Sequence, residues 1–180
     1  LNENLDKHVR IALANHIEFT LQRLEQGMGI TNPFLRETKT LYDKEYQLAQ
    51  QAVKMIEDRF EIPVPEEEIG FITLHIHAAR TEREVSATAK YTSLIGEMVN
   101  IIEEEWQVTL SYQSLNYARL ITHLRFALER IENNVKKDTK ENPLLNKIEV
   151  LDKIETEFST SYQLAARLVE FMEDELQEEV

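Results

Sequence analysis

Apolar residues recur at steps of three and four along most of the chain, and this is the period of an amphipathic α-helix. The first such run covers 5–24 and is followed by Gly27 and Gly29. Because glycine commonly ends helices, we expect this helix to stop there. A second run covers 37–60 and ends before Pro63, so it predicts a second long helix.

The third predicted helix begins with a proline and three carboxylates. Pro65 suits the first turn of a helix, and Glu66, Glu67 and Glu68 follow where the helix dipole favours negative charge. We interpret these carboxylates as a helix start or a solvated face. The stretch 69–79 that follows is apolar nearly all round, so we expect it to be buried between other elements.

The rest of the chain shows the same helical pattern. A polar stretch over 80–86 predicts a boundary between two halves. Further helices are predicted over the following ranges, with a solvated loop over 133–143: 87–106, 112–133, 144–157 and 162–178. The chain has only 4 glycines and 4 prolines, fewer than a sheet-rich fold with many tight turns requires. These patterns predict an all-α protein.

An internal repeat predicts that the chain holds two copies of one domain. Residues 13–25 align without gaps on 120–132, and six of the 13 positions are identical. A second block, 46–58, matches 162–174 in the same order. The repeat therefore predicts two tandem copies of a small helical-bundle domain.

We place the first copy at 1–82 and the second at 87–180. The run 87–106 has no counterpart in the first copy, whose opening helix we expect upstream of this chain. The counterpart of His75 would fall past residue 180, so we expect the last helix of the second copy and its histidine to be missing as well. On this reading the chain is part of a longer protein.

Charge and cysteine content exclude several classes of function. Asp and Glu number 33 against 20 Lys and Arg, which gives a net charge of −13. A nucleic-acid ligand needs a cationic face, so we predict that this chain alone does not bind RNA tightly. The absence of cysteine excludes disulfides, thiolate metal sites and cysteine nucleophiles. No apolar run is long enough to span a membrane, and we expect a cytoplasmic protein.

Two of the five histidines occupy equivalent positions in the repeat. His16 and His123 are each followed by Phe at +3 and Arg at +7, positions that share one face of a helix. A neutral imidazole nitrogen is a competent nucleophile, and the arginine (Arg23 in the first copy, Arg130 in the second) can stabilise a phosphate that arrives on it. The alternative is that both are core histidines that serve packing alone.

The other histidines and the acidic runs form no recognisable catalytic pattern. His75 and His77 lie about 200° apart around a helix, so they cannot both face one ligand. We interpret His8 and His77 as structural or solvent-facing. The chain contains no HExxH, no His-Asp dipeptide and no histidine with Glu three residues before it. We therefore expect no metal, no cofactor and no enzymatic activity.

Three strings, taken together, resemble a known family. They are Asn15-His16-Ile17 followed by Phe19 and Arg23, the run Gly-Phe-Ile-Thr-Leu-His-Ile over 70–76, and Thr-His-Leu-Arg-Phe over 122–126. In this order and spacing they are similar to the tandem phosphotransferase-system (PTS) regulation domains of BglG/SacY-type bacterial transcriptional antiterminators. The resemblance covers essentially the whole chain.

The resemblance implies regulation through phosphohistidine. In that family, histidines accept phosphate from the phosphocarrier HPr or from a sugar-specific enzyme II, and phosphorylation resets dimer packing and RNA binding. Carried over by motif, the phosphorylation sites are His16 and His75 in the first domain and His123 in the second. The family often has Asp before the first histidine, whereas this chain has Asn15, an amide without negative charge.

The resemblance also implies a homodimer that binds RNA only through a domain upstream of this chain. We predict a homodimer from the helix over 69–79 as well, whose apolar surface exceeds what one thin bundle needs to bury. Two alternatives stay open: a helical protein-interaction scaffold with structural histidines, and the regulation module of a PTS-controlled transcription activator. An all-α metal-dependent enzyme ranks third.

Overall fold

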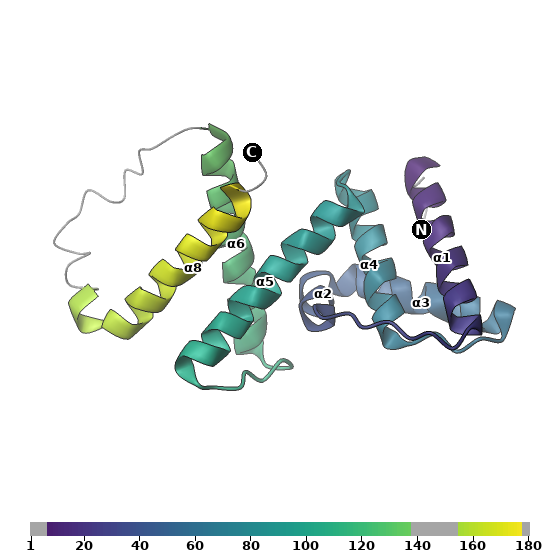
Figure 1. The fold of residues 1–180 in the computed structure, drawn as a ribbon, viewed down its shortest axis with the longest axis horizontal. Helices are drawn as coiled ribbons and strands as arrows, with labels where there is room; N and C mark the ends of the chain where they lie inside the picture. The colour runs from purple at the N-terminus through teal and green to yellow at the C-terminus, as the bar shows by residue number, and fades with distance from the viewer. Residues whose placement is uncertain (1–6, 138–154, 178–180) are drawn as a thin grey trace. The chain divides into compact units, whose positions relative to one another are not determined.

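The computed structural model describes residues 7–137 and 155–177, with side chains described over 10–132 and 155–176. Helices joined by turns and short loops make up these ranges, and no strand occurs in them (Figure 1). The all-α prediction is therefore confirmed.

By its internal contacts the chain divides into two units, Leu1–Gly96 and Glu97–Val180. The division falls within helix α5 (Val85–Trp106), which begins after the short polar turn that follows residue 81. The domain limits expected from the sequence, 1–82 and 87–180, stay a prediction.

The first unit is organised around α4 (Glu66–Thr81). This helix packs against α1 (Lys7–Glu25), α2 (Leu35–Leu41) and α3 (Asp43–Phe60) (Figure 1). A cluster of apolar side chains holds the helices together: Ala49, Val53 and Ile72, surrounded by Leu13, Ile56, Val64, Ile69 and Ile76. The prediction that 69–79 is buried is confirmed, because Ile72, Leu74 and Ala78 are almost fully enclosed.

The end of α1 is fixed by a glycine. Gly27 has φ 71°, and its N–H donates to the carbonyl of Leu24 at 2.9 Å. The N–H of Met28 donates to the carbonyl of Arg23 at 3.0 Å, which completes the double hydrogen bond of a Schellman motif. The helix therefore stops where the sequence predicts.

The prediction of one helix over 37–60 is wrong, because α2 and α3 are separate helices that meet at Tyr42. This residue has φ −125° and ψ 43°, which interrupts the helical path. Its ring stacks on His77 with centroids 3.9 Å apart, and its hydroxyl lies 3.2 Å from that of Thr92. Packing of this buried tyrosine against α4 and α5 accounts for a break that no Gly or Pro marks.

The second unit contains α6 (Leu115–Lys137) packed against α8 (Ser159–Gln177). The enclosed apolar residues of these two helices are Tyr117, Ile121, Leu124, Leu128, Leu164, Leu168 and Met172. Because α6 continues to residue 137, the prediction of a loop starting at 133 is wrong for its first five residues. The rest of that loop, and the predicted helix 144–157 up to residue 154, lie outside the described residues.

Candidate functional site

The first turn of α4 contains a fully buried carboxylate. Pro65 is extended (φ −68°, ψ 157°) and leads directly into Glu66, Glu67 and Glu68. The helix start is as predicted for these carboxylates, but Glu68 is 0% exposed and so does not belong to a solvated face. Because Glu68, Ile72 and His75 lie on neighbouring turns, this carboxylate enters the interior together with the apolar face of α4.

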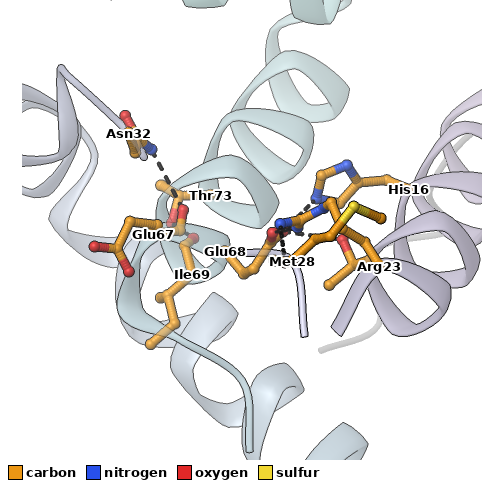
Figure 2. A network of polar contacts seen from close by, with 9 residues as sticks. His16, Arg23, Met28, Asn32, Glu67, Glu68, Ile69 and Thr73 are labelled. Carbon is orange, nitrogen blue, oxygen red and sulfur yellow. Dashed lines mark hydrogen bonds and ion pairs between the residues drawn. The ribbon is translucent and has the colours of Figure 1, made fainter. Parts of the chain in front are cut away.

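Three side chains of α1 surround Glu68, and Figure 2 shows two of them, His16 and Arg23. Arg23 donates from Nη2 to Oε1, and Thr20 donates from its hydroxyl to Oε2 at 2.9 Å. His16 brings its Nε2 to 3.2 Å from Oε2. The carboxylate therefore joins α1 to α4 through charged and neutral polar groups at once.

The partners of Glu68 keep it ionised despite its burial. Burial raises the pKa of this carboxyl, but contacts with His16 and Thr20 and the positive charge of Arg23 lower it, and the net pKa lies below its ordinary value. Removing either charge of the Arg23–Glu68 pair would leave the other unpaired in the interior, a strongly unfavourable state.

Arg23 is held in place by the helix end as well as by Glu68. Its Nη1 donates to the carbonyl of Met28 at 3.1 Å, just after the Gly27 turn. The guanidinium is buried and thus spans from the end of α1 to the start of α4. The residue that the sequence predicted to support phosphate is thus paired in the structure with a carboxylate 45 positions away in the sequence.

His75 lies beside His16. The centroids of the two rings are 4.8 Å apart, and Phe71 packs one helical turn before His75, with its ring 6.2 Å from that of His16. Burial, together with the nearby charge of His16, lowers the pKa of His75 to about 4. This imidazole is therefore neutral at pH 7. Its Nδ1 is buried and has no hydrogen-bond partner among the described residues.

His77 faces a different part of the same unit. Beyond its stacking on Tyr42, its Nδ1 lies 3.5 Å from a carboxylate oxygen of Glu45, which also accepts from Arg80 at 2.8 Å. Burial lowers the pKa of His77, although Glu45 opposes this effect. The structure thus gives His77 a packing environment apart from the His16–His75 pair. The side chain of His8 lies outside the described residues.

In the second unit, His123 and Arg130 are both solvent-exposed on α6. The phenyl ring of Phe126 is covered by Arg125, whose guanidinium carbon lies 4.7 Å from the ring centroid. The structure therefore does not bring His123 and Arg130 into a buried cluster of the kind that holds His16 and Arg23.

Glu68 is the residue of the candidate site that the sequence did not single out. The signal that could have identified it is its spacing from two later residues. Phe71 follows Glu68 at +3 and His75 follows it at +7, so all three lie on one helix face. The position of Glu68 on the helix face of a candidate histidine is more informative than its position in an acidic run.

Within 7–137 and 155–177, no group of three or more His, Asp or Glu side chains is placed to hold a metal ion. In the same ranges, no helix is both long enough and apolar enough to cross a membrane.

Comparison with known proteins identifies relatives of the whole chain. The "PtsGHI operon antiterminator" of Bacillus subtilis is 37% identical over 162 residues, which cover 90% of this chain and 55% of that protein. "Transcription antiterminator LicT" of the same species is 29% identical, covering 97% and 61%. "Protein GlcT" of Staphylococcus saprophyticus is 34% identical, covering 92% and 57%. The chain thus spans little more than half the length of these relatives.

A family model described as the PRD domain matches residues 1–79 and again 96–180. The two matches agree with the internal repeat and confirm the resemblance found in the sequence. Because together they cover most of the chain, the chain belongs to the PRD domain family.

Proposed function

We propose that this chain is the regulatory module of a transcriptional antiterminator and accepts phosphate on His16, His75 and His123. The donors in this proposal are the PTS proteins HPr and a sugar-specific enzyme II. Phosphorylation would control self-association of the module and, through it, RNA binding by a domain upstream. Two of the relatives reported above carry the name antiterminator, which supports the setting.

The observation that carries the proposal is the pairing of His16 and His75. Two helices far apart in the sequence bring their imidazoles to a centroid distance of 4.8 Å, next to the Arg23–Glu68 ion pair. A structural histidine needs no second histidine at its side. A pair of partly exposed imidazoles beside a fixed cation suits the reception of phosphoryl groups.

Charge explains how phosphate would act as a switch. By analogy with other phosphorylated residues, a phosphohistidine brings roughly −1.5 to −2 charges. Arg23 is already paired with Glu68. The new negative charge would therefore lie near a buried carboxylate, and Arg23 would not be free to neutralise it. The cluster must then either release Arg23 toward the phosphate or separate α1 from α4. Both responses alter the surface around α1.

Self-association is part of the proposal, but the surface expected for it changes. Ile72, Leu74 and Ala78 of α4 are enclosed within the first unit, which leaves less of this helix for a dimer surface than the sequence suggested. Exposed apolar side chains lie instead on α1 and α3: Ile11, Phe19, Met55 and Phe60. These side chains are the better candidates for contact with a second copy.

The test is a gain of phosphate on the purified chain. After incubation with phosphorylated HPr and enzyme II, intact-mass measurement should show acid-labile phosphate, which a His16→Gln/His75→Gln/His123→Gln variant fails to acquire. Light scattering should show a shift in association for His16→Asp and His75→Asp. His77→Gln is the control for both measurements. Glutamine is used at this position because aspartate would put a second carboxylate beside Glu45. A mass without phosphate would overturn the proposal.

A further inference from the structure

The contact between His16 and Glu68 determines where the proton of the imidazole lies. Nε2 of His16 is buried and lies 3.2 Å from Oε2 of Glu68, a close polar contact whose angles do not meet those of a hydrogen bond. An ionised carboxylate offers only lone pairs, and a second lone pair at this distance would be repelled. Nε2 must therefore carry hydrogen, and the neutral ring has its free lone pair on Nδ1.

Burial distinguishes the two nitrogens in the same way. Nε2 faces the carboxylate inside the network, whereas the other ring nitrogen points away from it (Figure 2). The His16 side chain is 20% exposed as a whole. A donor protein can thus approach Nδ1 without opening the Arg23–Glu68 pair, while access to Nε2 would require that pair to separate.

From this geometry we propose that Glu68 is a positioning residue for phosphoryl transfer to His16, holding the Nε2–H tautomer so that Nδ1 is the acceptor. The inference rests on the proposed function, in which His16 receives phosphate. Glu68 supplies from α4 the negative charge that Asn15 lacks on α1. A carboxylate that fixes the tautomer of a reactive histidine is a general device in enzymes and metal sites.

The transfer step is balanced as follows. The lone pair of Nδ1 forms a bond to phosphorus while the N–P bond of the donor phosphohistidine breaks, and the donor imidazole leaves with that electron pair. The His16 ring becomes positively charged and keeps its Nε2–H. Glu68, with Oε2 at 3.2 Å from this nitrogen, stabilises the charge as it develops. No oxidant, metal or further reactant takes part.

The first experiment reads the tautomer directly in the unphosphorylated chain. Two-bond ¹H–¹⁵N correlation at mildly alkaline pH, where imidazoles are neutral, should show His16 as the Nε2–H form alone. The signal is assigned by its loss in His16→Gln. Glu68→Gln should give a mixture of both tautomers, because an amide can donate as well as accept. Glu67→Gln, the same charge change one residue away, should leave the spectrum unchanged.

The second experiment locates the phosphate. With phosphorylated HPr as donor, NMR should place phosphate on Nδ1 of His16, and Glu68→Gln should slow its arrival on the order of tenfold to a hundredfold, as for other carboxylates behind a reactive histidine. The wild-type spectrum needs no variant, so the inference is testable even if Glu68→Gln does not fold. An Nδ1–H tautomer in the wild type, or phosphate on Nε2, overturns this inference alone. Absence of phosphate from every histidine overturns the proposed function, and this inference with it.

Discussion

The equivalent helices α1 and α6 carry the same His, Phe and Arg spacing but place these residues in different environments. In α1, Arg23 is buried against Glu68 and His16 is close to His75. In α6, His123 and Arg130 are exposed. The phenylalanines are outward-facing in both, with 64% of Phe19 and 49% of Phe126 exposed.

The motif on α1 therefore does not make the site by itself. Glu68, Phe71 and His75 all come from α4, which packs on α1, whereas α8 packs on α6 and its enclosed residues are apolar. The chemistry of His16 therefore depends on how α4 is seated. Substitutions that disturb the packing of α4 should therefore affect the first unit and not the second.

The largest difference is expected for the two arginines. Arg23→Ala leaves Glu68 as a buried carboxylate without its cation, which should reduce the free energy of unfolding of the first unit by about 3–5 kcal/mol. Arg130→Ala removes an exposed side chain and should change the free energy of unfolding of the second unit by less than about 0.5 kcal/mol. Urea unfolding followed by circular dichroism measures both. Similar losses in the two variants would contradict the comparison.

A smaller loss is expected where α4 meets the loop before α2. A methyl group at Gly70 would lie 2.5 Å from Nδ2 of Asn32 and 2.7 Å from a methyl of Leu35. Gly70→Ala should therefore destabilise the first unit by about 2 kcal/mol through overpacking. Gly96→Ala is the control, since its methyl would lie 3.5 Å from Glu37, at ordinary contact distance. Equal melting temperatures for both variants would show that α4 is not seated in this way.

Thr20 offers a test in which the repeat itself supplies the substitution. Its hydroxyl donates to the buried Glu68, and position 127 of the repeat has alanine instead. Thr20→Ala should lower the free energy of unfolding by about 1.5 kcal/mol, as expected for a lost hydrogen bond to a charged group. Thr122→Ala on α6 removes an exposed hydroxyl that bonds only to its own helix, and serves as control. A neutral Thr20→Ala result would mean that Glu68 does not need this donor.

The smallest effect concerns acid. His75 has a folded pKa of about 4 against an ordinary 6.5, so the unfolded chain binds its proton at higher pH than the folded chain. Its contribution to stability is complete above pH 6.5 and is lost as the pH falls toward 4, by about 1 kcal/mol once its partial exposure is considered. His75→Gln should flatten this dependence in urea titrations, and His123→Gln should not. A slope unchanged by His75→Gln would refute the assignment.

Local pattern was sufficient for most of the helices and for the end of α1, since apolar periodicity and the Gly27 turn act within one helix. It was insufficient at Tyr42, where contact with His77 and Thr92 breaks a helix that the periodicity continues. Contacts between helices decide where such a break occurs, and the residues next to Tyr42 in the sequence give no sign of them.

The site was predictable in part for the same reason. His16 and Arg23 were recognisable because they share one face of one helix. Their pairing with His75 and Glu68 depends on the packing of α1 on α4, and the charges at Glu66, Glu67 and Glu68 look alike in the sequence. Only burial separates Glu68 from its exposed or partly exposed neighbours.

The most direct test of the account is to map phosphate on the chain after incubation with phosphorylated HPr and enzyme II. Digestion and mass spectrometry at alkaline pH preserve phosphohistidine, and fragmentation separates His75 from His77. The account predicts phosphate on His16 and on His75, the pair that α1 and α4 bring together. Phosphate found on other histidines while both of these stay unmodified, or no phosphate on the chain at all, would contradict it.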